Sequence, residues 1–342
     1  MKLTVKNIIK ETEDVISVGF TNGGFFSKVK YKPGQFITLH FPIADKIHKR
    51  AYSFSSNPYT DKDLKITIKR VENGLVSNYV HDYLKVGDKL LIDKPNGSFF
   101  IKPEKEQQKS YVFFAAGSGI TPIFSIINSV LQKETKSSIV LVYASRFFEG
   151  IIFHKELVEL QKKYGDRFKI EYLISKNAPT KPNYHKGLIT DALVVETLDK
   201  YELPFENCEY MICGPFGFME AVKSILNVNG VSPLRIKEEL FKRPDTVIQS
   251  DGMTSKVKIQ LNGTSHELNI ANNKSILQAA MAENIDMPYS CRSGMCSTCI
   301  ASCVSGTVNM TDGHFLGQKE VDAGKILTCV SYPASENVVI SI

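Results

Sequence analysis

The sequence lacks any long apolar run. None of its stretches reaches the ~18 uninterrupted apolar residues that indicate a membrane-spanning helix. The first residues, MKLTVKNIIKETED, contain no apolar segment followed by a small-residue cleavage site, so the sequence predicts no signal peptide. We therefore expect a soluble, cytoplasmic protein with no membrane partner.

Runs of positive charge and internal repeats are also missing. The formal net charge is only +6, and Lys and Arg form no run long enough for a nucleic-acid-binding patch. We therefore expect no nucleic-acid partner. Hydrophobic residues make up 43% and charged residues 23%, which is ordinary for a globular protein. The length of 342 residues corresponds to two or three domains.

Cysteine is scarce, yet four of the seven cysteines lie in the two short pieces CRSGMCSTC and LTCV. In a cytoplasmic protein, clustered cysteines are more often metal ligands or redox groups than disulfides. Cys291-x4-Cys296-x2-Cys299, followed after 29 intervening residues by Cys329, has the spacing of plant-type two-iron ferredoxins. Small residues between the ligands allow the loop to wrap a cluster and point backbone N–H groups at its sulfurs. Zinc, the alternative, usually takes two C-x2-C pairs, and this loop has one.

The pattern of short elements divides the chain into segments. Residues 1–104 read as short β-branched strands with one helical piece, LVSNYVHDYL, which predicts an antiparallel β-barrel. Residues 105–243 alternate apolar strands with helices, which predicts an α/β domain with a parallel sheet. Residues 244–255 are polar and read as a linker. Residues 256–342 open with two strands around Asn262-Gly263, a hairpin signal, and contain the cysteine loop.

The last segment, 256–342, resembles a plant-type ferredoxin along its whole length. The pieces PYSCRSGMCSTC and ILTCVSYP carry the resemblance. It implies an α+β domain of the β-grasp type that holds a [2Fe-2S] cluster through Cys291, Cys296, Cys299 and Cys329.

Three motifs in the first two segments suit a flavin and a nicotinamide coenzyme. Arg50-Ala51-Tyr52-Ser53 ends a barrel strand and offers a phosphate-binding guanidinium, an aromatic face and a hydroxyl. Gly74-Leu75-Val76-Ser77 opens the helix of the barrel segment, and helix N-termini bind phosphates. AAGSGITP, from Ala115, has the pattern GxGxxP between a strand and a helix. Each motif alone also has an ordinary reading: a strand, a helix cap or a tight turn.

Together with Cys213-Gly214-Pro215, these motifs resemble the ferredoxin–NADP reductase family across residues 1–243. The resemblance implies that FAD binds at Arg50, Tyr52 and Ser53, that Cys213 lies near the nicotinamide, and that Glu239 is the acidic residue at the C-terminal edge of the nicotinamide domain. It also implies an aromatic flavin shield at Phe241, although here the chain continues beyond that residue. The implied catalytic residues are Ser53, Cys213 and Glu239. The implied cofactor-binding residues are Arg50, Tyr52, Ser53, Gly74, Val76, Ser77, Gly117, Gly119, Thr121, Pro122, Ser145, Arg146, Cys213, Gly214, Pro215 and Phe241.

Ser145-Arg146 bears on the choice of coenzyme because it follows the strand IVLVYA. An acidic residue at this place would bind the 2′-hydroxyl of NADH, whereas an arginine suits the 2′-phosphate of NADPH. We therefore expect NADPH in preference to NADH. The alternative is that Arg146 is a solvated charge at a strand end.

NADPH delivers two electrons at once, a [2Fe-2S] cluster accepts one, and a flavin can do both. The expected flow is NADPH to FAD to cluster to a protein acceptor. The order of domains resembles the reductase subunit of phenylacetyl-CoA epoxidase and related oxygenase reductases, which implies a di-iron oxygenase or hydroxylase component as the acceptor. Two alternatives remain at this point: a self-standing NAD(P)H reductase with a small-molecule acceptor, and a redox-sensing regulator. The hydride-donor motifs argue against the regulator.

Overall fold

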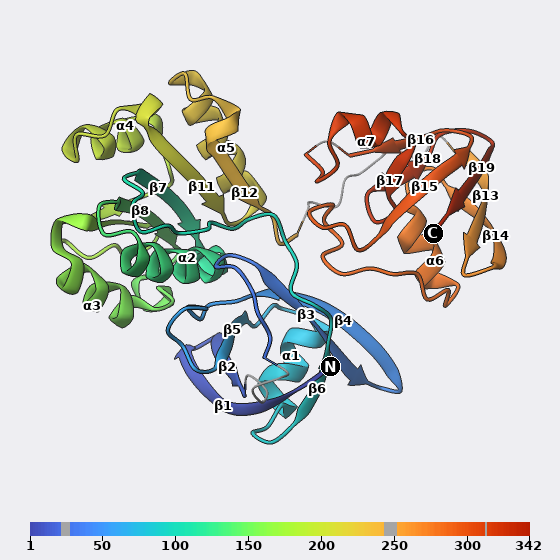
Figure 1. Ribbon diagram of the computed structural model, residues 1–342, viewed down its shortest axis with the longest axis horizontal. Coiled ribbons are helices and arrows are strands. Elements are labelled where there is room, and N and C mark those ends of the chain that lie inside the picture. Colours follow the sequence, from blue (N-terminus) through green and yellow to red (C-terminus); the bar gives the residue numbers. More distant parts are fainter. Residues whose placement is uncertain (22–27, 243–251, 312) are drawn as a thin grey trace. The chain divides into compact units, whose positions relative to one another are not determined.

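The computed structural model describes residues 1–21, 28–242, 252–311 and 313–342. The chain divides into two compact units, Met1–Phe241 and Lys242–Ile342 (Figure 1). Of the predicted linker, residues 244–251 lie outside the described part. Thr254 and Ser255 already belong to the first strand of the second unit.

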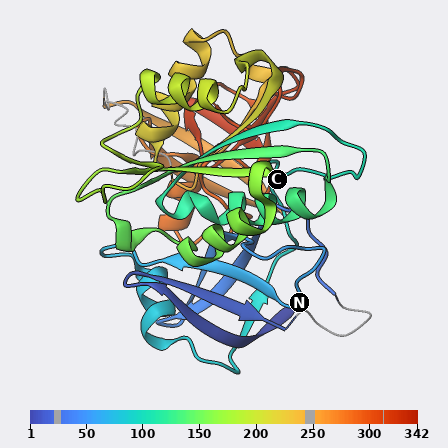
Figure 2. The same ribbon diagram turned by 90° about the vertical axis from the view of Figure 1, so that its left-hand side faces the viewer.

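The first unit begins with an antiparallel barrel, drawn in blue to cyan in Figure 2. Its strand order is β4-β3-β6-β1-β2-β5. An isolated bridge between Phe54 and Ile66 joins the end of β4 to β5 and closes the barrel. The helix α1 (Leu75–Tyr83) buries Val76 and Val80 in the barrel core. The strands are β1 (Lys2–Thr12), β2 (Val15–Phe20), β3 (Phe36–Ile43), β4 (Lys46–Ser53), β5 (Leu64–Lys69) and β6 (Lys89–Ile92). The predicted antiparallel barrel is confirmed.

The unit continues with a parallel sheet, in strand order β10-β9-β8-β7-β11-β12. Helices cover both faces, α2 and α3 on one and α4 and α5 on the other (Figure 1). Strands buried on both faces are continuously apolar, as SYVFFAA is in β7. The strands are β7 (Ser110–Ala116), β8 (Ser138–Ser145), β9 (Phe168–Ile174), β10 (Tyr184–Lys186), β11 (Cys208–Cys213) and β12 (Ile236–Glu239). The helices are α2 (Ile120–Lys133), α3 (His154–Tyr164), α4 (Asp191–Lys200) and α5 (Phe216–Val228).

Buried polar contacts hold the barrel against α2. The Ser125 hydroxyl donates to the carbonyl oxygen of Ser56 at 2.6 Å, and the Ser129 hydroxyl donates to Asn57 Oδ1 at 3.2 Å. All four residues are buried. Buried, satisfied polar contacts tolerate little displacement, because a separated partner would lose its hydrogen bond. The end of β4 is therefore held at a fixed place relative to the parallel sheet.

The second unit contains a mixed five-stranded sheet, in order β14-β13-β19-β15-β17, and the pair β16-β18. Asn262 and Gly263 both have positive φ, 50° and 79°, as a two-residue type I′ turn requires, so the predicted hairpin is confirmed. The short helix α6 (Ile276–Ala282) begins with a capping box of Ser275 and Gln278. The other elements are β13 (Thr254–Leu261), β14 (Thr264–Ala271), β15 (Ile300–Ser305), β16 (Val308–Met310), α7 (Gln318–Asp322), β17 (Lys325–Leu327), β18 (Ser331–Pro333) and β19 (Asn337–Ser341). Among the described residues, no helix has the length and apolarity to cross a membrane.

Candidate redox site

The end of β4 carries the first motif. Successive strand residues point to opposite faces, so Arg50 and Tyr52 share one face and Ser53 lies on the other. Arg50 and Tyr52 are half-buried, and Ser53 is buried. Tyr52 packs edge-on against Phe41 with ring centroids 6.3 Å apart, and burial raises the pKa of its hydroxyl, so the ring stays neutral. A fixed, neutral aromatic ring beside a guanidinium suits a flavin and its phosphates.

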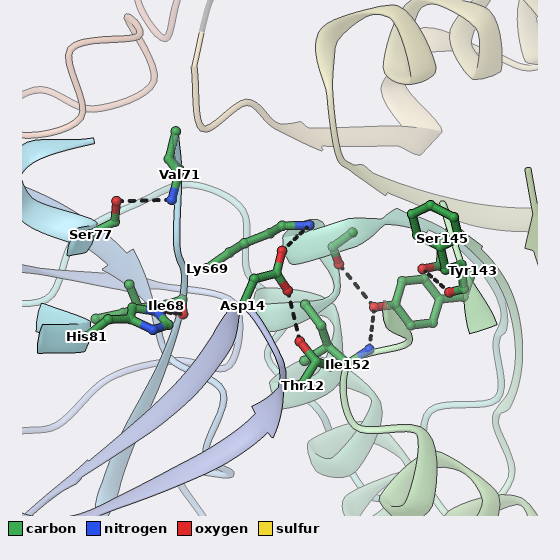
Figure 3. Close-up of polar contacts among 12 residues, drawn as sticks. Thr12, Asp14, Ile68, Lys69, Val71, Ser77, His81, Tyr143, Ser145 and Ile152 are labelled. Carbon is green, nitrogen blue, oxygen red and sulfur yellow. Dashed lines mark hydrogen bonds and ion pairs between the residues drawn. The ribbon is translucent and has the colours of Figure 1, made fainter. Parts of the chain in front are cut away.

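The N-terminus of α1 carries the second motif. In the described structure no side chain caps this helix, and its first turn has no acidic residue. Ser77 Oγ accepts from the N–H of Val71 at 3.1 Å (Figure 3). It also donates to the carbonyl oxygen of Gly74 at 3.2 Å. A Cβ on Gly74 would lie 2.5 Å from that same Oγ, so the turn needs glycine.

This arrangement changes how two predicted residues can contribute. The Ser77 hydroxyl is engaged within the turn, and the Val76 side chain is buried in the barrel core. Their backbone N–H groups, at an uncapped helix start, are the groups that suit a phosphate. The side chains of Val76 and Ser77 therefore shape the turn, and the backbone N–H groups at the start of α1 are the groups that could bind a phosphate.

The glycine loop of the third motif joins β7 to α2. Gly117 has φ of +53°, and a Cβ on Gly119 would lie 2.1 Å from the carbonyl oxygen of Cys213, so glycine is required there by close approach. The Tyr143 hydroxyl donates to the carbonyl oxygen of Gly117 at 3.1 Å. Thr121 and Pro122 are buried in the first turn of α2 and fix the start of the helix.

The end of β4 meets the parallel sheet at Ser53, whose hydroxyl donates to Glu239 Oε2 at 3.0 Å. Glu239 pairs in register with Cys213 on the neighbouring strand. Cys213 is fully buried, and burial raises the pKa of its thiol well above the usual value, with the Glu239 carboxylate adding to the effect. The structure thus brings together the three predicted catalytic residues from three separate strands or strand ends.

A cavity of about 930 Å³ lies at the carboxyl ends of the parallel strands, where open α/β sheets bind their ligands. Gly117, Ser145, Arg146 and Pro215 of the predicted set line it. Gly214 is fixed by packing, since a Cβ there would lie 2.9 Å from the Cβ of Ala116.

The barrel supplies one wall of this cavity, which the sequence did not reveal. Thr12, Glu13, Asp14 and Lys69 line it. The Thr12 hydroxyl donates to Asp14 Oδ1 at 2.9 Å, and Lys69 Nζ lies 3.2 Å from Asp14 Oδ2 (Figure 3). No local motif marks these residues, because the β1–β2 turn reaches the cavity only through the tertiary fold.

Two cations lie near Phe147: Arg146, which lines the cavity with it, and Lys176, which is not part of the lining. The Arg146 guanidinium carbon lies 5.7 Å from the Phe147 ring centroid, and Lys176 Nζ lies 5.9 Å from it. The Lys176 N–H also donates to the carbonyl oxygen of Arg146 at 2.9 Å. Glu13 and Glu149 line the same cavity, so it carries charge of both signs.

Phe241 ends the first unit, directly after the buried Leu240. Its side chain is 41% exposed, so it is not the buried hydrophobic residue that an ordinary strand end would provide.

The four predicted ligand cysteines lie in the second unit as two pairs. The sulfurs of Cys299 and Cys329 are 3.3 Å apart. A hydrogen bond from Cys291 lowers the pKa of Cys296 to about 6, and one from Cys329 lowers the pKa of Cys299. In the described part of the chain, no three or more His, Cys, Asp or Glu side chains converge on a single ion position. Two thiol pairs suit the two irons of a [2Fe-2S] cluster, which is held by four cysteine thiolates.

The loop backbone favours this arrangement. Arg292 and Gly294 have positive φ of 54° and 77°, which curls the chain between Cys291 and Cys296. The N–H of Ser293 donates to the Cys291 sulfur at 3.5 Å, and the Thr298 hydroxyl lies 3.5 Å from the Cys296 sulfur. Polar hydrogens directed at thiolate sulfurs stabilise the deprotonated form that binds iron.

Three family models match successive parts of the chain. They are the oxidoreductase FAD-binding domain over residues 2–101, the oxidoreductase NAD-binding domain over residues 113–224, and the 2Fe-2S iron-sulfur cluster binding domain over residues 259–334. Fold and sequence together define a class of oxidoreductase with FAD, NAD and 2Fe-2S domains in one chain.

Two curated relatives span almost the whole protein. The ferredoxin reductase component of 3-ketosteroid-9-alpha-monooxygenase from Rhodococcus rhodochrous is 32% identical, over 98% of this chain and 95% of the relative. A component of the 1,2-phenylacetyl-CoA epoxidase from Escherichia coli K12 is 30% identical, over 99% of this chain and 96% of the relative. Among solved structures, phthalate dioxygenase reductase matches 100% of this chain and 98% of its own, with 25% identity and a TM-score of 0.66. The chain therefore belongs to the family of reductase components of oxygenase systems.

Replacing Ser53 by alanine is expected to slow reduction of bound FAD by the nicotinamide coenzyme about 10²-fold, because a small misplacement at a reacting centre costs this much. The variant should retain its flavin, since the hydroxyl bonds Glu239. Stopped-flow absorbance of the flavin measures the rate.

Ser55→Ala is the matched control, because that buried hydroxyl bonds Thr67 Oγ1 inside the barrel at 2.9 Å. Equal rates in the wild type and the Ser53 variant would remove Ser53 from the reaction centre.

Proposed function

We propose that this protein is the NADPH-dependent reductase of an oxygenase system, which passes electrons from NADPH through FAD and a [2Fe-2S] cluster to a di-iron oxygenase or hydroxylase component such as that of phenylacetyl-CoA epoxidase. We place it in the cytoplasm, where thiols are kept reduced. The domains we propose are an FAD barrel over residues 1–104, a coenzyme domain over 105–243 and a ferredoxin domain over 256–342.

The observation that carries the proposal is the contact between the end of β4 and the parallel sheet. Ser53 donates to Glu239, and Glu239 lies beside Cys213, at the carboxyl edge that also opens into the 930 Å³ cavity. The flavin-binding and coenzyme-binding motifs therefore meet at one buried point, as direct hydride transfer requires.

Each set of residues has a distinct task in this proposal. FAD, when bound, accepts a hydride and releases single electrons. Arg50 and the α1 N-terminus hold its phosphates, and Tyr52 covers one ring face. Ser53 and Glu239 fix the reacting atoms through their hydrogen bond, while the buried neutral thiol of Cys213 keeps water out of the centre.

Arg146 and Lys176 support NADPH over NADH. Two cations within 6 Å of the Phe147 ring centroid gather positive charge at the end of β8, where a 2′-phosphate would lie. Asp14 is paired with Lys69, so its charge opposes a phosphate less than an unpaired carboxylate would.

Arg146→Ala is expected to raise the KM for NADPH by about tenfold to a hundredfold and to leave the KM for NADH nearly unchanged. A charge-assisted hydrogen bond contributes about 1.5–3 kcal/mol, which gives this range. Steady-state kinetics with both coenzymes and a dye acceptor measure the effect.

Arg70→Ala serves as the control, since Arg70 is an exposed arginine paired with Asp82 outside the lining of the cavity. A parallel rise in the KM of both coenzymes would show that Arg146 does not bind the 2′-phosphate.

The acceptor is tested by reconstitution with purified oxygenase components. The likeness to a component of 1,2-phenylacetyl-CoA epoxidase supports an epoxidase as the partner. The similar likeness to a 3-ketosteroid-9-alpha-monooxygenase component makes that oxygenase the comparison. The proposal is supported if this protein and NADPH give product with the epoxidase components but not with the 3-ketosteroid-9-alpha-monooxygenase components. Turnover only with small dyes would favour a self-standing reductase.

A further inference from the structure

Thr311 and the segment Gly313–Leu316 lie against the cysteine loop at two points, and we refer to these residues as the strap. The N–H of Phe315 donates to the carbonyl oxygen of Gly294 at 2.8 Å. The N–H of Thr311 donates to the carbonyl oxygen of Val330 at 3.1 Å. Gly294 lies between the ligands Cys291 and Cys296, and Val330 follows the ligand Cys329. The strap is therefore attached beside ligands of both thiol pairs.

The strap also carries two buried polar atoms that have no hydrogen-bond partner within the described structure, Thr311 Oγ1 and His314 Nδ1. His314 packs closely on the loop, since its Cβ is 3.5 Å from the position that a Cβ on Gly294 would take. Buried polar groups in native proteins almost always have a partner, so an orphan atom points to a partner outside the polypeptide, which is either a bound group or a water molecule.

We propose that Thr311 and His314 donate hydrogen bonds to sulfur atoms at the cluster site and thereby set its reduction potential. Both side chains can donate, and the site gathers sulfur acceptors that carry negative charge. Hydrogen bonds to the sulfurs stabilise the additional negative charge of the reduced state and make the potential more positive. In this proposal the strap sets the reduction potential of the cluster from which electrons leave the protein.

The inference deepens the proposed function, because it requires the cluster to be bound by the four cysteines. The test is therefore made on the full-length holoprotein by a dye-mediated dithionite titration, followed by EPR, without NADPH or a protein acceptor. Iron content and the presence of an EPR signal report on the cluster itself, and the midpoint potential reports on the strap. A chain with no iron would refute the cluster, whereas an unchanged potential would refute only the strap.

Thr311→Val removes the hydroxyl at almost constant shape, and Thr311→Ser retains it. His314→Leu removes the ring nitrogens, and His314→Asn retains an N–H near the Nδ1 position. In Thr311→Val and His314→Leu we expect the reduced-to-oxidised ratio at a fixed ambient potential to fall by up to about tenfold, which is ~59 mV for a one-electron couple. The serine and asparagine variants should stay near the wild-type value.

Wild-type potentials in Thr311→Val and His314→Leu, with the cluster fully loaded, would overturn the proposal and assign the two atoms to bound water. If His314→Leu does not retain iron, the comparison of Thr311→Val with Thr311→Ser decides in the same way.

Discussion

Cys296→Ser is expected to abolish electron transfer to any one-electron protein acceptor while NADPH still reduces FAD. Cys296 is one of the four predicted cluster ligands, so its replacement leaves three thiolates for two irons. The serine hydroxyl is a harder and far less acidic ligand than a thiol, so one iron loses one of its thiolate ligands. Iron analysis and the EPR signal of the reduced protein measure the loss.

Cys303→Ser is the matched control for this variant. Cys303 lies on β15, its thiol contacts only the carbonyl oxygens of Ser305 and Gly306 among the hydrogen bonds of the described residues, and burial raises its pKa. It should keep full iron content and full activity. An EPR signal of wild-type shape and intensity in Cys296→Ser would refute the ligand assignment.

A chain ending after Lys242 is expected to bind FAD, oxidise NADPH and reduce small dyes at close to the full rate, and to lose all activity with acceptors that draw on the cluster. It retains the entire first unit, Met1–Phe241, including the Ser53–Glu239 contact and the coenzyme cavity. The complementary piece should assemble a cluster but show no NADPH activity.

The complementary piece should begin at or before Met253. Lys256, where the sequence alone places the start of the last domain, is the third residue of β13, and the N–H of Asn272 donates to the carbonyl oxygen of Met253 at 3.1 Å. A chain that starts at Lys256 would lack the first two residues of β13 and the hydrogen bond between Met253 and Asn272. If the chain ending after Lys242 folded well but lost its flavin, the proposed boundary would be wrong, and the ferredoxin domain would form part of the flavin site.

Local chemistry explains what could be predicted from the sequence. The Asn262-Gly263 turn, the strand–glycine–helix order around Gly117 and the spacing of the cysteines each depend on neighbours in the chain. Such features fix a backbone conformation within a few residues. Their patterns therefore predict the three domains and the turns in which glycine is needed.

The remaining features depend on contacts between distant residues. Ser53 and Glu239 are separated by 186 positions, and only the packing of the barrel on α2 brings them within 3.0 Å. The barrel wall of the cavity, with Asp14 and Lys69, has no local signature at all. Ser77 is a different case. The sequence motif locates the turn correctly, but it does not predict that the Ser77 hydroxyl forms its hydrogen bonds within that turn.

The order of electron flow is the central claim, and rapid mixing of the anaerobic holoprotein with NADPH tests it most directly. Flavin absorbance and freeze-quench EPR are followed in the same time course. The account predicts that the flavin is reduced first, that the EPR signal of the reduced [2Fe-2S] cluster rises afterwards, and that Cys296→Ser shows only the first event. A cluster signal that precedes flavin reduction, or one that never appears although the flavin is fully reduced, would contradict it.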